Sequence, residues 1–275
     1  MTKKLKIRPG IPLYGLPLKR GNNPFIILPY GKEVKVGVDI YRSGTLNIDF
    51  QINTSSLNNR VNTLLKEAYC KTLENILKFL DTKLKVKISI DIDFPYSPLY
   101  IYDTTIPVLL KTITTLVGIS LSRRDIMVLL REFDTLKTGR ELVGLRNAMR
   151  TYSLIRKPLI YREGEGHIIL GLNNQKITSE IGNIVTVNYL PEYTIKYIEN
   201  PLADLLIHLH GRLVIEAAQA LRNGDLDKAK ILYKCESIIN LCFIDANIPI
   251  SKSVVKPPKI VMDFKGITIM TLGIN

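Results

Sequence analysis

The sequence predicts an α+β protein with two lobes, and three observations predict this fold class. Apolar residues alternate at a period of two near both ends of the 275-residue chain, as they do in half-buried strands. Longer segments between them carry apolar residues at steps of three and four, which indicates amphipathic helices. Helices and strands follow one another without an internal repeat or a flexible linker. This mixed order favours two lobes that combine sheets with helices.

The first 50 residues predict strands separated by turns. Residues 25–29 form a short apolar run, and residues 34–41 alternate so that their valines and Ile40 share one face. The alternation resumes over residues 46–50, after the turn signal Ser43–Gly44. Because alternation on both sides of such a turn is typical of a hairpin, we expect these two strands to pair with each other.

The clearest helix is predicted over residues 58–80, where one face is apolar and the other carries lysines and a glutamate. Residues 86–92 alternate again and predict a strand. Pro95 and Pro98 then break the chain. We expect the next helix to hold Pro107 in its first turn and to run to about residue 117.

Ser122 followed by Asp125 resembles a capping box and opens the next predicted helix. A further helix is predicted over residues 141–152. Strands with glycine turns between them are predicted over residues 159–172 and 184–190. Within them, Glu163 and Glu165 lie in a Glu-Gly-Glu-Gly run that indicates a hairpin turn rather than an acid/base pair.

A long helix is predicted to begin at Asn200–Pro201 and to run to about residue 222. Its apolar residues cover a wide arc, which favours core packing, with a homodimer face as the alternative. Gly224 ends this helix, and Asp225 caps another that runs to about residue 242. The chain returns to strand over residues 260–272. The apolar residues of the long helix are Leu205, Leu206, Leu209, Leu213, Ile215 and Ala217.

The chain is basic, with 38 basic and 25 acidic side chains and a formal net charge of +13. A charge of this size indicates an anionic partner such as a phosphorylated metabolite, a nucleotide, nucleic acid or a membrane surface. The alternative is a lysine-rich solvated surface. Lys, Ile and Leu recur throughout, a composition compatible with a heat-adapted organism.

Cysteine usage and the N-terminus predict a cytoplasmic protein. Cys70, Cys235 and Cys242 lie in helical, apolar segments, so we expect buried free thiols in a reducing compartment. The basic N-terminal residues are not followed by an apolar segment, which argues against a signal peptide. Since no apolar run is long enough to cross a bilayer, we expect no membrane span.

Four stretches resemble the GHMP superfamily of small-molecule kinases. Residues 8–15, RPGIPLYG, resemble its opening motif, although the acidic residue after the glycine is missing. The helix, strand and Pro95 that follow resemble the segment with the phosphate loop. Asp134, Gly139 and Gly144 resemble the helix pair that carries the catalytic aspartate. Residues 220–226 and the helix after them resemble the C-terminal helical pair.

This resemblance implies a two-lobed GHMP-kinase-like fold. Its N-terminal lobe would resemble ribosomal protein S5 and cover residues 1–160, and its C-terminal α/β lobe would be ferredoxin-like and cover residues 161–275. The related archaeal β-ribofuranosylaminobenzene 5′-phosphate synthases bind a phosphoribosyl donor, and they keep a glycine-rich loop that this chain lacks.

The phosphate loop departs from the family pattern. A Gly-Leu-Gly-Ser-Ser type run lets backbone N–H groups close around phosphate at a helix N-terminus. Residues 95–104 instead read PYSPLYIYDT, without a glycine, with Pro98 lacking a donor and Asp103 repelling phosphate. We therefore interpret this segment as a vestigial phosphate-loop region. The residues of this region are Pro95, Ser97, Tyr100 and Thr104.

The resemblance also leaves the catalytic residue unknown. The position of the family aspartate holds Asn147, or Arg146 in an alignment shifted by one residue, and asparagine cannot act as a base. The closing glycine-rich motif is reduced to one glycine, Gly266. ATP and Mg²⁺ stay open as cofactors, whereas ordinary ATP-dependent kinase activity is not expected.

Residues 123–162 carry ten basic and four acidic side chains, and Arg146 and Arg150 fall one helical turn apart. Arginine suits bidentate contacts to phosphate or carboxylate, so an anionic ligand would relieve their repulsion. The alternative is a solvated helix face with paired arginines. The predicted ligand-binding residues, placed near the cleft between the lobes, are Arg140, Arg146, Asn147 and Arg150.

Aromatic and histidine residues give weaker signals. Tyr96, Tyr100 and Tyr102 cluster in the segment that replaces the phosphate loop, where they either stack a ligand or pack the loop. His208 and His210 are two residues apart on a helix and point in nearly opposite directions, so they cannot share a metal. No metal site is predicted.

Three functions follow. The first is a divergent GHMP-like protein that binds or acts on a phosphorylated or acidic small metabolite without ordinary kinase activity. The second is an active ATP-dependent kinase, or a phosphoribosyl-transferring synthase of the same superfamily. The third is a nucleic-acid-binding module that uses the net charge of +13.

Overall fold

The computed structural model describes most of the chain, and contacts divide it into two compact units. The first unit consists of Met1–Pro9, Lys32–Lys137 and Ser153–Ile155. The second consists of Gly10–Gly31, Thr138–Tyr152 and Arg156–Asn275. The described residues are 1–16, 23–54, 57, 59–94, 96–172, 183–190, 196–197, 203–242, 244–245, 258–263 and 266–273.

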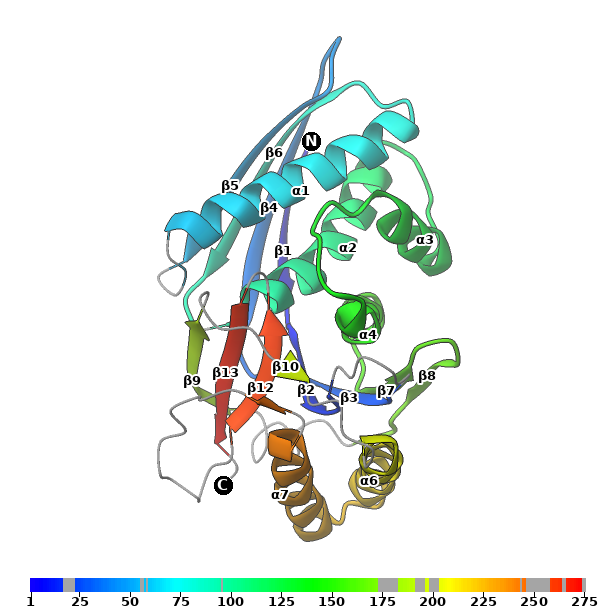
Figure 1. Ribbon diagram of the computed structural model, residues 1–275. Coiled ribbons are helices and arrows are strands. Elements are labelled where there is room, and N and C mark those ends of the chain that lie inside the picture. The colour runs from blue at the N-terminus through cyan, green and yellow to red at the C-terminus, as the bar shows by residue number, and fades with distance from the viewer. Residues whose placement is uncertain are drawn as a thin grey trace. The chain divides into compact units, whose positions relative to one another are not determined.

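The first unit contains a four-stranded sheet with helices packed against it (Figure 1). Its strands are β1 (Thr2–Ile7), β4 (Val34–Arg42), β5 (Asn47–Thr54) and β6 (Leu84–Ile92), in the order β1-β4-β6-β5. Alternate residues of β4 and β6 are buried, as their period-two patterns predict.

The predicted hairpin between the second and third of these strands is wrong. Val38 of β4 lies opposite Ile88 of β6 in an antiparallel pair, and Phe50 of β5 lies opposite the same Ile88 in a parallel pair. β6 therefore separates β4 from β5, and helix α1 (Asn59–Phe79) makes the crossover that parallel pairing requires. Alternation predicts which face of a strand is buried, but it does not predict the neighbour.

Helices α1, α2 (Pro98–Leu116) and α3 (Arg123–Phe133) complete the first unit. The helix predicted over residues 58–80 is α1. The capping box of α3 is confirmed, because Ser122 N donates to Asp125 Oδ2 at 2.8 Å and Asp125 N donates to Ser122 Oγ at 3.2 Å. These hydrogen bonds with Ser122 lower the pKa of the Asp125 carboxyl below its ordinary value.

The predicted helix start at Pro107 is wrong, because α2 begins nine residues earlier at Pro98 and Pro107 lies in its interior. Ser97 caps the helix and Pro98 occupies its first turn, where a missing N–H costs nothing. Every residue from Pro98 to Leu110 is buried. Packing on all sides of the helix outweighs the roughly 3 kcal/mol that an interior proline costs.

The second unit contains another four-stranded sheet, in the order β2-β3-β7-β8. Its strands are β2 (Gly10–Tyr14), β3 (Phe25–Pro29), β7 (Leu159–Arg162) and β8 (Gly166–Ile169). β7 and β8 form a hairpin in which Arg162 pairs with Gly166, so the turn predicted at Glu163–Glu165 is confirmed.

Helices lie on both faces of this sheet (Figure 1). A 3₁₀ turn (Arg140–Leu142) leads into α4 (Val143–Ile155) on one face. Gly144 of α4 lets the helix approach, since a Cβ there would lie 3.3 Å from the Phe25 ring. On the other face, α6 (Ala203–Asn223) contacts β3 and α7 (Leu226–Cys242) contacts β2.

The boundary between the C-terminal helices lies where the sequence predicts, whereas the single strand predicted over residues 260–272 is two antiparallel strands. Gly224, with a φ of 74°, separates α6 from α7, and Asp225 Oδ1 accepts from Lys228 N at 3.0 Å as the predicted cap. β9 (Asn183–Leu190), β12 (Pro258–Asp263) and β13 (Gly266–Gly273) form a sheet in the order β12-β13-β9, and β10 (Lys196–Tyr197) pairs with β11 (Ile244–Asp245). The predicted helix start at Asn200–Pro201 lies outside the described residues.

The apolar arc of α6 is only partly core. Leu213 and Ala217 are buried, whereas Leu205, Leu209 and Ile215 are exposed. Leu16, which follows β2, packs against Leu206 and Ile207 of α6 and Ile239 of α7. Core packing therefore explains the apolar residues on one side of α6, whereas the apolar residues on its other side are exposed.

Two of the cysteines are free thiols in the part of the chain where side chains are described. Cys70 is half-buried, and burial raises the pKa of its thiol. Cys235 is exposed, so the expectation that all the cysteines are buried is wrong. Within the described residues, no helix is long and apolar enough to cross a membrane.

Candidate functional site

The start of α2 lies where the resemblance places the phosphate loop. Ser97 is fully buried and caps the helix, with its Oγ accepting from Tyr100 N at 3.5 Å and its carbonyl accepting from Ile101 N at 2.9 Å. Pro98 has no N–H to offer. Pro95 lies outside the described residues. The Tyr100 amide is therefore bonded to the Ser97 hydroxyl rather than directed at a ligand, and the Ile101 amide makes the first regular hydrogen bond of the helix.

A row of aromatic rings covers this helix start. Phe94 and Tyr96 lie edge to face at 5.7 Å, and Tyr96 and Tyr100 lie edge to face at 5.8 Å. All three rings are at most 2% exposed, and Lys32 Nζ lies 5.9 Å above Phe94. The tyrosines were expected in a loop, but Tyr100 lies in α2. They pack against protein and occupy the surroundings of the first turn.

Buried hydroxyl groups continue along α2 in the first unit. Tyr102 Oη lies 2.8 Å from Thr72 Oγ1 and donates to Asp134 Oδ1 at 2.9 Å. The same Asp134 oxygen accepts from Leu136 N at 2.8 Å. Asp134 thus holds the end of α3 against α2. Thr104 is fully buried, and its Oγ1 has no partner among the described residues.

The predicted ligand-binding residues lie in the second unit. Arg146 and Arg150 are 7% and 4% exposed, and they lie one turn apart on α4. Arg146 Nη1 donates to Thr138 Oγ1 at 3.2 Å. Arg140 lies in the 3₁₀ turn before α4 and is exposed. α4 therefore concentrates two guanidinium groups in a poorly hydrated region.

Asn147, at the position that the resemblance compares with the family aspartate, contacts the hairpin of the sheet. Its Nδ2 donates to Glu163 Oε2 at 3.0 Å, and Tyr161 Oη donates to the same oxygen at 2.8 Å. Burial and then the hydrogen bond to Glu163 raise the pKa of Tyr161. The Glu163 carboxylate, from the chain segment after α4, therefore lies beside Asn147.

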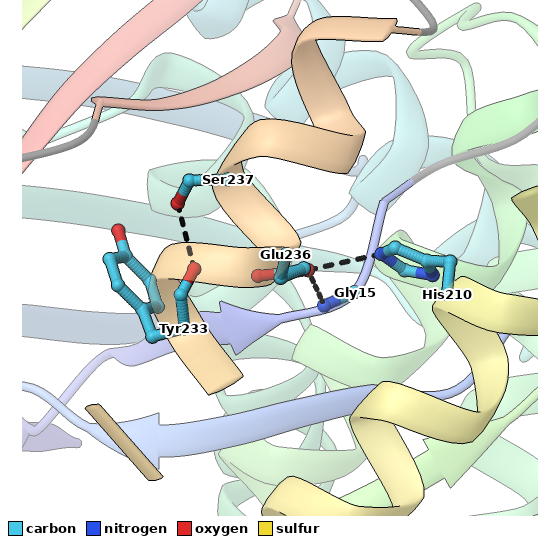
Figure 2. Close-up of polar contacts among 5 residues, drawn as sticks. All are labelled: Gly15, His210, Tyr233, Glu236 and Ser237. Atoms are coloured by element: carbon cyan, nitrogen blue, oxygen red, sulfur yellow. Dashed lines mark hydrogen bonds and ion pairs between the residues drawn. The ribbon is translucent and has the colours of Figure 1, made fainter. Parts of the chain in front are cut away.

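A second polar cluster joins the opening motif to the C-terminal helices (Figure 2). Glu236 Oε1 accepts from Gly15 N at 2.6 Å and lies 3.1 Å from His210 Nε2. His210 and Glu236 are both 0% exposed. Gly15 has a φ of 108°, and a Cβ there would lie 2.7 Å from the Pro24 carbonyl, so only glycine fits.

Two tyrosines extend this cluster. Tyr14 Oη donates to the Ala229 carbonyl at 2.5 Å, and its ring meets Tyr233 edge to face at 5.9 Å. Burial raises the pKa of both phenols, with the Glu236 charge as the next cause. The opening and C-terminal motifs therefore lie side by side, and the acidic side chain beside Gly15 comes from Glu236.

The fold is the one that the resemblance predicts, since solved GHMP-superfamily structures superpose on almost the whole chain. L. major mevalonate kinase in complex with R-mevalonate is 13% identical with a TM-score of 0.67, covering 98% of this chain and 87% of that one. S. aureus mevalonate diphosphate decarboxylase is 11% identical with a TM-score of 0.58, covering 98% and 87%. S. pneumoniae phosphomevalonate kinase in complex with phosphomevalonate and AMPPNP is 11% identical with a TM-score of 0.57, covering 99% and 92%.

This likeness establishes a GHMP-kinase-like, two-lobed α+β fold. No protein-family model matches the sequence, and a search of curated proteins finds no match. Because kinases and a decarboxylase share this fold, the reaction has to be argued from the side chains.

Sequence reasoning predicted that the α4 residues bind a ligand, but it did not predict the contacts that Glu163 and Glu236 make with other segments. Glu163 was interpreted as a turn residue, and nothing linked Gly15 to Glu236, which is 221 positions away. The sequence did contain a signal for Glu236, because its spacing of three residues from Tyr233 places both on one face of a helix. The structure shows that this face of α7 is buried. No group of three or more metal-binding side chains occurs among the described residues.

Proposed function

We propose that this chain binds a small metabolite carrying a phosphate or carboxylate group, and that it does not transfer phosphate from ATP. The structural neighbours are recorded with acidic ligands, R-mevalonate and phosphomevalonate, which supports this ligand class. The claim that the chain does not transfer phosphate from ATP rests on the start of α2. Its Tyr100 amide is bonded to Ser97, Pro98 has no N–H, and buried aromatic rings pack beside it.

The proposed anion-binding groups are the basic residues at α4, Arg140, Arg146 and Arg150, with Asn147 beside them. Two buried guanidinium groups one turn apart repel each other, and an anion between or beside them lowers that energy. Arginine also binds carboxylate and phosphate through two parallel hydrogen bonds. Asn147 is anchored on Glu163 and offers an amide for orientation.

Titration calorimetry with phosphomevalonate and R-mevalonate as probes tests this proposal. We expect saturable binding of at least one probe to the wild type and a loss of roughly tenfold in affinity for Arg150→Gln. Arg140→Ala keeps the proposal testable where the buried variant fails to fold, because Arg140 is exposed. Arg131→Ala is the matched control, since Arg131 is an exposed α3 residue that pairs with its neighbour Glu132. Unchanged affinity in both variants would refute the α4 site, and release of ADP from Mg-ATP with either probe would refute the absence of kinase activity.

Nucleic-acid binding is a second candidate, and one observation favours it. Five exposed lysines share the outer face of the sheet in the first unit, against three aspartates. Phosphate contacts of this kind make affinity fall steeply with salt. A flat salt response in an RNA and DNA titration would exclude it. The lysines are Lys4, Lys6, Lys35, Lys85 and Lys87, and the aspartates are Asp39, Asp49 and Asp91.

A further inference from the structure

A polar groove in the second unit lies along α6, apart from the α4 residues. It has a volume of about 750 Å³, which is in the range of small-molecule sites. One wall is α6, and the other is formed by Asn23 and Pro24, which precede β3, and by Arg162 at the end of β7. α4 packs on the opposite face of the same sheet (Figure 1), so this groove is distinct from the site proposed above.

Asn23 is the first reason to place a ligand here. Its side chain is 6% exposed, and its Nδ2 has no hydrogen-bond partner among the described residues. A buried amide without a partner is unfavourable, and nearly all such groups in folded proteins are satisfied by protein, water or ligand. Asn23 lines the groove and its Oδ1 lies nearest to Gly211, so a ligand hydroxyl in the groove would hydrogen-bond to this amide.

Gly211 is the second reason. It lies in the middle of α6, where glycine is unfavourable relative to alanine. Packing does not require it, since a Cβ at this position would meet nothing closer than Asn23 Oδ1 at 3.9 Å. The missing side chain leaves open the part of the groove that lies beside the Asn23 amide.

The charges along the groove are balanced. Arg162 and Arg212 contribute donors, and Asp204 and Glu216 contribute acceptors. Glu216 pairs with Arg212 at 3.3 Å and Arg162 pairs with Glu165 at 2.7 Å, both in exposed positions where such pairs are weak. A charged ligand would meet one set of these groups favourably and the other unfavourably. Hydroxyl groups donate and accept, so they suit both sets.

We infer that this groove binds a neutral polyhydroxylated small molecule of the sugar or polyol class. The ligand donates from a hydroxyl to the Asn23 amide oxygen and places other hydroxyls between the arginines and carboxylates of α6 and β7. Pro24, Ile207 and Ile215 offer apolar contacts to its carbon atoms. The inference does not depend on the α4 site, because no residue is shared between the two.

Ligand-observed NMR and calorimetry with glucose, xylitol and glycerol as neutral probes test the inference, alongside glucose 6-phosphate and glycine as charged ones. Gly211→Met fills the groove, and Arg222→Met is the matched control at an exposed α6 position that does not line it. Asn23→Leu removes the amide at similar volume. Since the Nδ2 has no partner among the described residues, we expect this variant to unfold at a temperature no lower than the wild type.

The expected result is saturable binding of a neutral probe to the wild type and to Arg222→Met, with at least a tenfold loss in Gly211→Met and in Asn23→Leu, roughly the effect of one lost hydrogen bond. The inference is overturned by the absence of saturable binding of every neutral probe at about 10 mM. It is also overturned when a charged probe binds more tightly than the neutral ones and loses that affinity in Gly211→Met, or when Gly211→Met binds the neutral probes as the wild type does.

Discussion

The start of α2 and the neighbourhood of α6 differ in how their buried polar groups are hydrogen-bonded. At α2, Ser97 accepts from the amides three and four positions away, and the rings of Tyr96 and Tyr100 pack against each other. At α6, Glu236 and His210 depend on each other and on Gly15, while Asn23 keeps an unpartnered amide at the groove. Amides that are satisfied locally stabilise a helix start, whereas an unsatisfied amide beside an open groove indicates a ligand. The resemblance directed attention to α2, but the open binding capacity lies elsewhere.

The largest effect is expected from Glu236→Ala. This carboxylate is fully buried, and its removal leaves the Gly15 amide and the His210 ring without their partner. We expect the free energy of unfolding to fall by about 3 kcal/mol or more, measured by urea denaturation. Glu74→Ala, which breaks an exposed pair with Lys78, is the control and should cost less than about 1 kcal/mol. Equal losses in both variants would mean that the buried Glu236 contacts stabilise the fold no more than an exposed ion pair does.

A smaller effect is expected from Ser97→Ala. The substitution frees the Tyr100 amide at a buried helix start, and we expect a loss of about 1–2 kcal/mol in the free energy of unfolding. Ser122→Ala removes the exposed cap of α3 and serves as the comparison. A negligible loss for Ser97→Ala would mean that the Tyr100 amide already has another acceptor. The Ser97 hydroxyl would then not cap this helix start.

Asp125→Asn should produce a change in stability that depends on pH. The Ser122 hydrogen bonds lower the pKa of Asp125 in the folded state, so its contribution is present above the unfolded pKa of about 4 and disappears as pH falls through the lower folded value. The variant should be less stable than the wild type at pH 7, and the two should converge on acidification. Thermal unfolding from pH 7 down to about pH 2 measures this, and a constant difference would contradict the assignment.

The smallest effect is expected from Thr104→Val, which replaces a buried hydroxyl without a partner among the described residues by a methyl group of similar size. We expect the free energy of unfolding to stay within about 0.5 kcal/mol or to rise. A loss above about 1 kcal/mol in chemical denaturation would reveal a hydrogen bond to Thr104 and would sharpen the description of the α2 environment.

The sequence predicted the parts of this fold that depend on neighbours along the chain. Alternation predicted β4, β5 and β6, helical spacing predicted α1, and short-range signals predicted the caps at Ser122 and Asp225. The pairing of β5 with β6 was missed, because one strand pattern is compatible with several neighbours. The start of α2 was misplaced because Pro107 looked like a first-turn proline, and only burial on all sides explains its interior position.

The candidate sites were predictable only in part for the same reason. Arg146 and Arg150 share a helix face, so their closeness follows from spacing. The Gly15–Glu236 bond joins residues 221 positions apart, and Asn23 meets Gly211 across two segments that no local signal connects. Contacts of this kind depend on how the sheet and helices pack, which a single sequence does not encode in any short window.

Titration calorimetry with Mg-AMPPNP tests most directly the central claim that the start of α2 no longer receives nucleotide phosphates. The account predicts no saturable binding to the wild type up to about 10 mM nucleotide, because the Tyr100 amide is bonded to Ser97, Pro98 has no N–H, and the rings of Tyr96 and Tyr100 are packed at this helix start. Saturable binding accompanied by slower hydrogen exchange in the first turn of α2 would contradict it and would restore a nucleotide site at this helix.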